Sequence, residues 1–198
     1  PLLSFGGWMT ISNLLLPLMI QVDRYLVGAW VSVAVVAYYA TPSEVVVKLL
    51  VFPRAWMSVL FPSFAAHAHS DPEGVSDLFG RAVKYLLCGL FPAVALIVAF
   101  APEGLDLWIG SDMSERGAPI MRWLGYGMYL HSRVYVPYLF VQAVGRPDIS
   151  ARIHLVEFPL YLAAAFFLIR NFGIRGAAYA WVLRAVLDLS LMYGAATR

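Results

Sequence analysis

The sequence has little charge and only one cysteine. Charged residues make up 13% of its 198 positions, whereas soluble domains contain about 25%. Hydrophobic residues make up 61% of the chain, and a soluble domain of this size has too much surface to hide so many apolar side chains. The composition therefore excludes an ordinary soluble domain and indicates a polytopic membrane protein.

The scarcity of cysteine and of clustered charge excludes further classes. Cys88 lies in an apolar run, so a single chain can form neither a disulfide framework nor a cysteine metal site. We expect its thiol to be a small buried apolar side chain. The net charge of the chain is only +2, and the basic residues are scattered along the sequence, so no nucleic-acid partner is expected.

Enzyme motifs are also absent from the sequence. It contains no glycine-rich phosphate loop, no HExxH pair and no G-x-S-x-G elbow. No catalytic residue and no metal site are therefore predicted.

Long apolar runs are abundant. A helix that crosses a bilayer needs about 20 apolar residues, and the sequence predicts an all-α bundle of six transmembrane spans, at about 3–27, 33–64, 81–101, 118–144, 151–169 and 174–195. Pro42, Pro53 and Pro62 predict kinks in the second span, because proline has no backbone N–H. The polar stretches 65–80 and 102–117 are expected to be loops.

Charged residues lie within or at the ends of these spans: Asp23, Arg24, Glu44, Lys48, Arg54, Arg133, Glu157, Arg184 and Asp188. A charge at the centre of a membrane helix costs about 2.5–3.5 kcal/mol on insertion scales, so these side chains must pair or face water. Glu44 with Lys48, and Arg184 with Asp188, are four residues apart and share a helix face. Such pairs fit a clasp between helices or the lining of a hydrated cavity.

The deepest polar residues favour a cavity with an anionic ligand. The spans carry slightly more basic than acidic residues, which suits a phosphate group. Arg133 and Arg184 lie deepest in their spans and are expected to line such a cavity. Small residues between Gly173 and Ala180 recur at four-residue spacing, which predicts close helix packing.

Short motifs follow one another in order along nearly the whole chain. The first group is Asn13-Leu-Leu-Leu-Pro17, Asp23-Arg24-Tyr25-Leu-Val-Gly28, Ser32, Val36-Ala-Tyr-Tyr39, Pro42 and Glu44. The later ones are Leu60-Phe61-Pro62, Arg81-Ala-Val-Lys84-Tyr85, Ala101-Pro-Glu103, Leu107-Trp108-Ile-Gly110, Gly145-Arg-Pro-Asp148, His154-Leu-Val-Glu157 with Pro159 and Tyr161, and Gly173-Ile-Arg-Gly176 through Trp181, Arg184 and Asp188. This ordered set resembles the second half of Wzx-type polysaccharide and O-antigen flippases, in the MATE-like MOP exporter superfamily.

The resemblance implies a transporter of about twelve to fourteen helices, built as two six-helix bundles around a central cavity and working by alternating access. This chain would be the C-terminal bundle, without the N-terminal bundle of the same polypeptide. It would lie in the bacterial inner membrane, with its first, third and fifth spans starting from the cytoplasm. The substrate would be an undecaprenyl-diphosphate-linked oligosaccharide.

The resemblance also suggests roles for the charged residues. Those expected to line the substrate cavity are Arg24, Lys48, Arg133, Arg184 and His131. Those expected to balance charge, or to couple transport to H⁺ or Na⁺, are Asp23, Glu44, Glu157, Asp188 and His154. The two histidines fit hydrogen-bonded buried imidazoles at least as well. Apart from the coupling ion no cofactor is expected, and the partners would be lipid-linked oligosaccharide, membrane lipids and the N-terminal bundle.

Other classes stay open at this point. A membrane-embedded glycan polymerase or ligase would present its catalytic residues in a large extramembrane loop, and the stretches 65–80 and 102–117 are short for that role. A drug exporter of the same superfamily would have a more apolar cavity. A structural scaffold gives no reason for Arg184 at mid-membrane.

Overall fold

The computed structural model describes residues 2–67 and 70–196, and its regular elements there are all helical. They are α1 (Leu2–Trp30), α2 (Val33–Val47), the 3₁₀ turn η1 (Lys48–Leu50), α3 (Val51–His67), α4 (Pro72–Ala99), α5 (Ala101–Trp108), α6 (Ser111–Ser132), α7 (Tyr135–Ala143), α8 (Pro147–Phe172) and α9 (Ile174–Ala196). The prediction of an all-α fold is confirmed.

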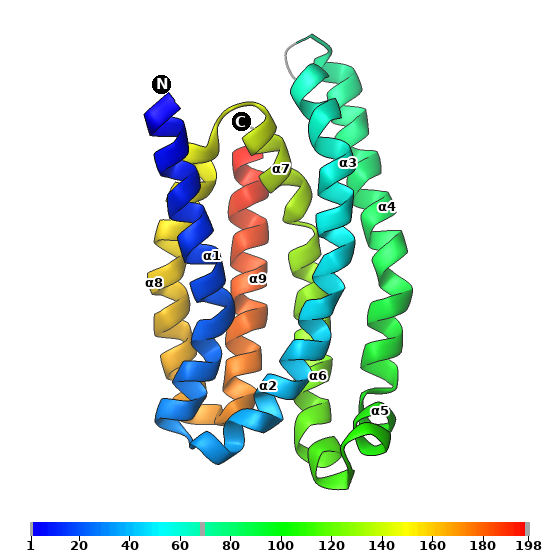
Figure 1. The fold of residues 1–198 in the computed structure, drawn as a ribbon, viewed down its shortest axis with the longest axis vertical. Coiled ribbons are helices and arrows are strands. Elements are labelled where there is room, and N and C mark those ends of the chain that lie inside the picture. Colours follow the sequence, from blue (N-terminus) through cyan, green and yellow to red (C-terminus); the bar gives the residue numbers. More distant parts are fainter. Residues whose placement is uncertain (1, 68–69, 197–198) are drawn as a thin grey trace.

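The helices form a bundle of long rods (Figure 1). The segments α2, η1 and α3 follow one another as one broken rod, and α6 and α7 form a second. Helix α9 packs against α1, α2, α6, α7 and α8, and so occupies the middle of the bundle. The two chain ends lie at one end of the bundle, and α5 lies at the other.

Three stretches among the described residues are long and apolar enough to cross a membrane: Val35–His67, Glu73–Ala99 and Pro147–Phe172. Helix α6 is more polar than these stretches, since it begins with Asp112, Glu115 and Arg116. The chain is a helical membrane protein. The number of six spans stays a prediction.

The interruptions in the two rods lie close to prolines. Pro53 cannot donate a hydrogen bond to the carbonyl of Leu49, four residues earlier, and the chain there tightens into η1. The predicted kink at Pro53 is therefore confirmed. Pro137 deprives the carbonyl of Arg133 of its donor in the same way, and the break between α6 and α7 falls at Arg133 and Val134. That second break was not predicted.

The predicted loop at 65–80 is wrong for most of its length. Helix α3 continues to His67, and α4 already begins at Pro72. The carboxylate of Asp71 caps α4 by accepting a hydrogen bond from the amide of Gly74, at 3.0 Å. The polar residues after it lie on the exposed face of an amphipathic turn, whose Val75 is buried. The polarity of the stretch 65–80 therefore indicates an exposed helix face rather than a loop.

The predicted loop at 102–117 is also mostly helical. Ala101 and Leu105, one turn apart, are buried and hold α5 against α6. The chain then turns at Gly110, whose φ of +120° favours glycine. Helix α6 starts directly afterwards, and the hydroxyl of Ser114 donates a hydrogen bond to the carbonyl of Pro102.

Two smaller expectations have opposite outcomes. The thiol of Cys88 is exposed on α4, so its predicted burial is wrong, because this face of α4 points away from the bundle. The predicted close packing around Gly176 is confirmed, since Gly176, Ala177 and Ala180 are buried where α9 packs on α8. A methyl group on Gly176 would meet the carbonyl oxygen of Leu168 at 2.0 Å.

Candidate functional site

The structure divides the ten candidate residues into two groups. One group is buried inside the bundle: Asp23, His131, His154, Glu157, Arg184 and Asp188. We call it the ionic cluster. The other group reaches the surface of the bundle to varying degrees: Arg24, Glu44, Lys48 and Arg133. The cluster joins residues of α1, α6, α8 and α9.

Arg184 lies near the middle of α9 and is the cation of the cluster. Its side chain is 2% exposed, and its Nε lies 3.9 Å from Oε1 of Glu157, which is 1% exposed. The guanidinium also lies over the rings of Tyr161 and Trp181, with its Cζ 5.5 and 5.9 Å from their centroids. Aromatic faces attract cations, so these rings stabilise a charge that has little access to water.

Asp188, one turn beyond Arg184 on the same helix, faces His131 of α6. The two atoms His131 Nδ1 and Asp188 Oδ2 are 3.5 Å apart. Arg184 and Asp188 share a helix face, as do Glu44 and Lys48. Among the described residues, however, neither of these two pairs forms an ion pair within 4 Å. Glu44 pairs instead with Arg24 of α1, and Arg184 with Glu157 of α8.

Two uncharged partners were not predicted as site residues. The hydroxyl of Tyr39 donates a hydrogen bond of 2.8 Å to Oδ2 of the buried Asp23. The hydroxyl of Ser12 lies 3.3 Å from Nδ1 of His154. Tyr39 belongs to the motif that carries the family resemblance and could have been found there. Ser12 has no such signal in the sequence.

Several polar atoms of the ionic cluster lack hydrogen-bond partners among the described residues. They are Oδ1 of Asp23, Nδ1 of His131, both carboxylate oxygens of Glu157, Oδ1 of Asp188, and Nε and Nη1 of Arg184. Three carboxylates thus share one guanidinium in a buried interior. Buried polar groups are nearly always satisfied, and unpaired buried charges are costly.

Two of the carboxylates, those of Glu157 and Asp188, lie close to the imidazole of His154. One ligand atom each of His154, Glu157 and Asp188 lies within 4.8 Å of the others. This spacing admits a small cation or a shared proton between helices α8 and α9. That no metal binds here stays a prediction.

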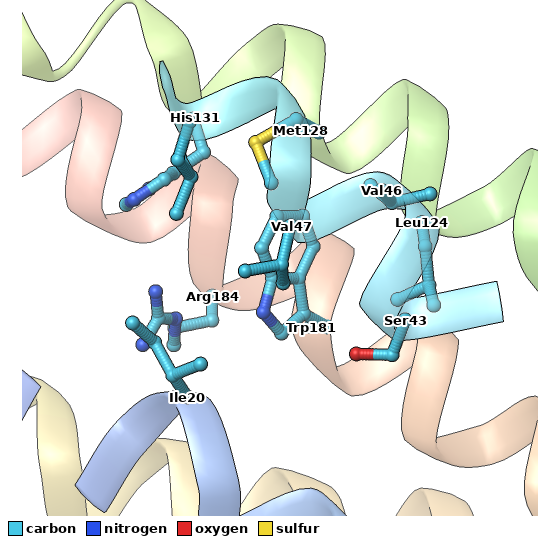
Figure 2. A pocket seen from close by; sticks show the side chains of 10 residues that line it. Ile20, Ser43, Val46, Val47, Leu124, Met128, His131, Trp181 and Arg184 are labelled. Carbon is cyan, nitrogen blue, oxygen red and sulfur yellow. The ribbon is translucent and has the colours of Figure 1, made fainter. Parts of the chain in front are cut away.

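Two cavities adjoin the cluster, and His131 lines both of them. Figure 2 shows the first, where His131, Arg184 and Trp181 face Ile20 of α1; its volume is about 20 Å³. The second has a volume of about 50 Å³ and is lined by residues that include His131, Tyr138, His154 and Asp188. A water molecule needs about 10–15 Å³ of space for its centre, so the first cavity has room for one water molecule and the second for a few.

The remaining candidates lie on an exposed polar stripe of α1 and α2. Nη2 of Arg24 pairs with Oε1 of Glu44 at 2.6 Å, with side chains 21% and 52% exposed. Lys48 is exposed one turn further along the same rod. Arg133 lies apart from this stripe, with its Cζ 5.5 Å from the centroid of the Tyr129 ring. Arg184 and His131 are buried here, so of the five predicted cavity residues only Arg24 and Lys48 lie on the stripe.

The described residues thus form a helical membrane bundle with charges both enclosed in its core and exposed along one stripe. The model of the family described as "Polysaccharide biosynthesis protein" matches residues 1–116, more than half of the chain. The chain belongs to this family, and the resemblance drawn from its motifs is confirmed.

Two curated proteins are similar to the chain. The protein named "Putative O-antigen transporter" of Shigella flexneri is 31% identical over 197 residues, which cover 100% of this chain and 47% of that protein. The protein named "Probable low-salt glycan biosynthesis flippase" of Haloferax volcanii is 22% identical over 170 residues, 85% of this chain and 36% of that protein. The chain thus spans less than half the length of these relatives. No solved structure matches it.

Proposed function

We propose that this chain is the C-terminal bundle of an exporter that flips undecaprenyl-diphosphate-linked oligosaccharide from the inner to the outer leaflet of the bacterial inner membrane. The supporting observation is the ionic cluster, held inside a membrane bundle of the polysaccharide biosynthesis family. One similar protein is named as an O-antigen transporter and the other as a glycan biosynthesis flippase. The chain itself acts as a transporter half and not as an enzyme.

The exposed polar stripe forms one wall of the substrate path in this proposal. Gln21 and Arg24 are one turn apart on α1, and the Arg24–Glu44 pair joins them to Lys48 on the neighbouring rod. Charges at this depth are too costly to face lipid, so the stripe faces the N-terminal bundle across a hydrated cavity. The cations Arg24 and Lys48 solvate the diphosphate as it passes.

The ionic cluster couples transport to an ion. If Asp23, Glu157 and Asp188 are all ionised, Arg184 leaves the buried cluster with two uncompensated negative charges. A membrane interior does not tolerate such a charge, so the cluster takes up H⁺ or Na⁺ from one side of the membrane and releases it on the other. Glu157 is the coupling carboxylate, because both of its oxygens lack hydrogen-bond partners among the described residues.

The test uses the complete exporter in proteoliposomes, with a probe that reports which leaflet holds the lipid-linked oligosaccharide. A proton or sodium gradient should accelerate flipping by the parent protein. Glu157→Gln keeps the shape of the side chain, and we expect it to lower gradient-driven flipping by about tenfold, which equals about 1.4 kcal/mol. The matched control is Glu103→Gln, which alters an exposed carboxylate on α5. If Glu157→Gln retains the full response to both gradients, the coupling role of Glu157 is wrong.

A further inference from the structure

The apolar core of the bundle consists of two separate clusters. The smaller one contains only residues of α3, the first half of α4, and α7: Leu60, Phe64, Val75, Ala82, Leu86, Val136 and Leu139. We call these three segments the small lobe. The larger cluster includes residues of α2, η1, α6, α8, α9 and the second half of α4, and the elements that build it form the large lobe.

The boundary between the lobes coincides with the two breaks in the rods. The large lobe extends to Leu50 in η1, and the small lobe begins with α3. In the second rod, Met128 of α6 belongs to the large cluster, and Tyr135, the first residue of α7, still packs against it. Val136 already belongs to the small cluster, so the boundary lies directly beside the break at 133–134. Both rods are thus interrupted close to the point where the core changes.

Helix α4 crosses the boundary without a break but contains two helix-weakening residues there. Leu86 belongs to the small lobe and Leu90 to the large lobe. Gly89 lies between them, and Pro92 follows within one turn. Glycine lowers helix stability and proline removes one hydrogen bond of the helix, so bending is easiest at this point.

The small lobe is held together internally and covers one of the two cavities. Helix α3 packs mainly on α4 and α7, and the indole of Trp56 donates a hydrogen bond of 3.2 Å to the carbonyl of Ala82. Helix α7 contributes Tyr135 and Tyr138 to the 50 Å³ cavity, opposite His154 and Asp188 of the large lobe. A movement of α7 therefore changes the access of water to the ionic cluster.

We propose that the small lobe is a gate that pivots as one body at η1, at Gly89–Pro92 and at residues 133–134, and that it opens the path of the coupling ion to the cavity beside His154 and Asp188. The proposal rests on the coupling role given to the ionic cluster above. The small lobe lies at the bundle end that holds both chain ends (Figure 1). The gate therefore opens toward the side of the membrane that faces this end of the bundle.

Distances between spin labels test the movement without any need for flipping. Labels at the exposed positions Val59 of the small lobe and Leu155 of the large lobe measure the distance between the lobes. Labels at Val59 and Tyr85 measure the small lobe alone, and labels at Leu155 and Leu191 the large lobe alone. The complete exporter carries these pairs in nanodiscs, with its other cysteines, Cys88 included, replaced by serine.

The gate predicts two populations for the Val59–Leu155 distance, whose ratio changes between acidic and alkaline buffer, with sodium, or with lipid-linked oligosaccharide. The two distances within lobes should keep one population throughout. A single unchanged Val59–Leu155 population under all these conditions would overturn the proposal. So would a shift of the Val59–Tyr85 distance, because the small lobe would then not move as one body.

A cross-link tests whether transport needs the movement. The ring of Phe79 in the small lobe lies against that of Tyr193 of α9, with centroids 5.9 Å apart. In a Phe79→Cys/Tyr193→Cys exporter, a bifunctional thiol reagent should lower flipping by at least about tenfold, and reductant should restore it. Equal flipping with and without the cross-link contradicts the gate. If the uncross-linked exporter does not flip lipid at all, the proposed function fails, while the label distances still judge the gate.

A pair of glycine variants isolates the pivot in α4. A methyl group at Gly89 or at Gly80 meets no atom within 4 Å, so alanine fits at both positions. Gly89→Ala stiffens α4 at the lobe boundary, and we expect it to slow flipping about threefold to fivefold. Gly80→Ala stiffens the same helix inside the small lobe and should leave the rate unchanged. Equal rates for the two variants would place the bend elsewhere and overturn the pivot at Gly89.

Discussion

Replacement of Arg184 by methionine removes the cation of the ionic cluster while it keeps a long side chain. Arg184 and Glu157 are 2% and 1% exposed, and their closest charged atoms are 3.9 Å apart. At an effective dielectric constant of about 20, two charges at this distance attract each other by about 4 kcal/mol. Loss of one partner of a buried pair costs about 3–5 kcal/mol, because the other charge stays buried without compensation. We therefore expect Arg184→Met to lower the free energy of unfolding by about that amount.

A double-mutant cycle separates the interaction of the pair from the cost of each change. Glu157→Gln alone removes the charge that Arg184 compensates, and the double variant Arg184→Met/Glu157→Gln removes both charges. The double variant should be more stable than the sum of the single changes predicts, with a coupling free energy of about 1–3 kcal/mol. The assay is unfolding of the complete exporter in mild detergent by titration with SDS, followed by circular dichroism.

An exposed ion pair supplies the control for this cycle. Arg81 Nη2 and Asp77 Oδ2 of α4 are only 2.9 Å apart, but their side chains are 57% and 69% exposed. Exposed pairs four residues apart on a helix contribute about 0.3–0.5 kcal/mol. We expect the Arg81→Met/Asp77→Asn cycle to stay in that range. If the cycle at Arg184 and Glu157 gives an equally small coupling, the reasoning that burial makes this pair strong is refuted.

Two further predictions concern packing and the exposed polar stripe. Gly176→Ala should lower the free energy of unfolding by about 1–3 kcal/mol, because the new methyl group would meet the backbone of α8. The control Gly194→Ala meets no atom within 4 Å and should leave the free energy of unfolding unchanged. Equal melting temperatures of the two variants would contradict the close packing. Glu44→Gln breaks the partly exposed pair with Arg24 and should cost less than about 1 kcal/mol in the same SDS titration. A loss above about 2 kcal/mol would show that this pair is fully buried in the complete exporter and does not line a hydrated path.

The enclosed charges were the most predictable part of the site. A charge within an apolar span must be shielded from lipid, and Asp23, Glu157, Arg184 and Asp188 are indeed buried. The pairing could not be predicted in the same way. Spacing along one helix suggested Arg184 with Asp188, but the bundle places Glu157 of α8 opposite Arg184, and such contacts depend on how the helices are rotated against each other.

The helix boundaries show where composition is a weaker guide than periodicity. The stretch 65–80 is polar, yet Val75, Leu78 and Phe79 recur at helical spacing and pack into the small lobe. The break at Arg133 had a signal in Pro137, four residues later. The sequence could not predict that this break and the break at η1 both lie at the boundary between the lobes, because that depends on which rods lie side by side.

The proposed function is tested most directly by where lipid-linked oligosaccharide accumulates when the gene is deleted. A leaflet-specific probe applied to spheroplasts and to inverted membrane vesicles distinguishes the two sides of the inner membrane. Deletion should strand single repeat units in the inner leaflet. The parent gene should restore their release, and a gene that encodes Glu157→Gln should restore it about tenfold more slowly. Units that reach the outer leaflet but stay unpolymerised would contradict the proposed function and would identify an enzyme of glycan assembly instead.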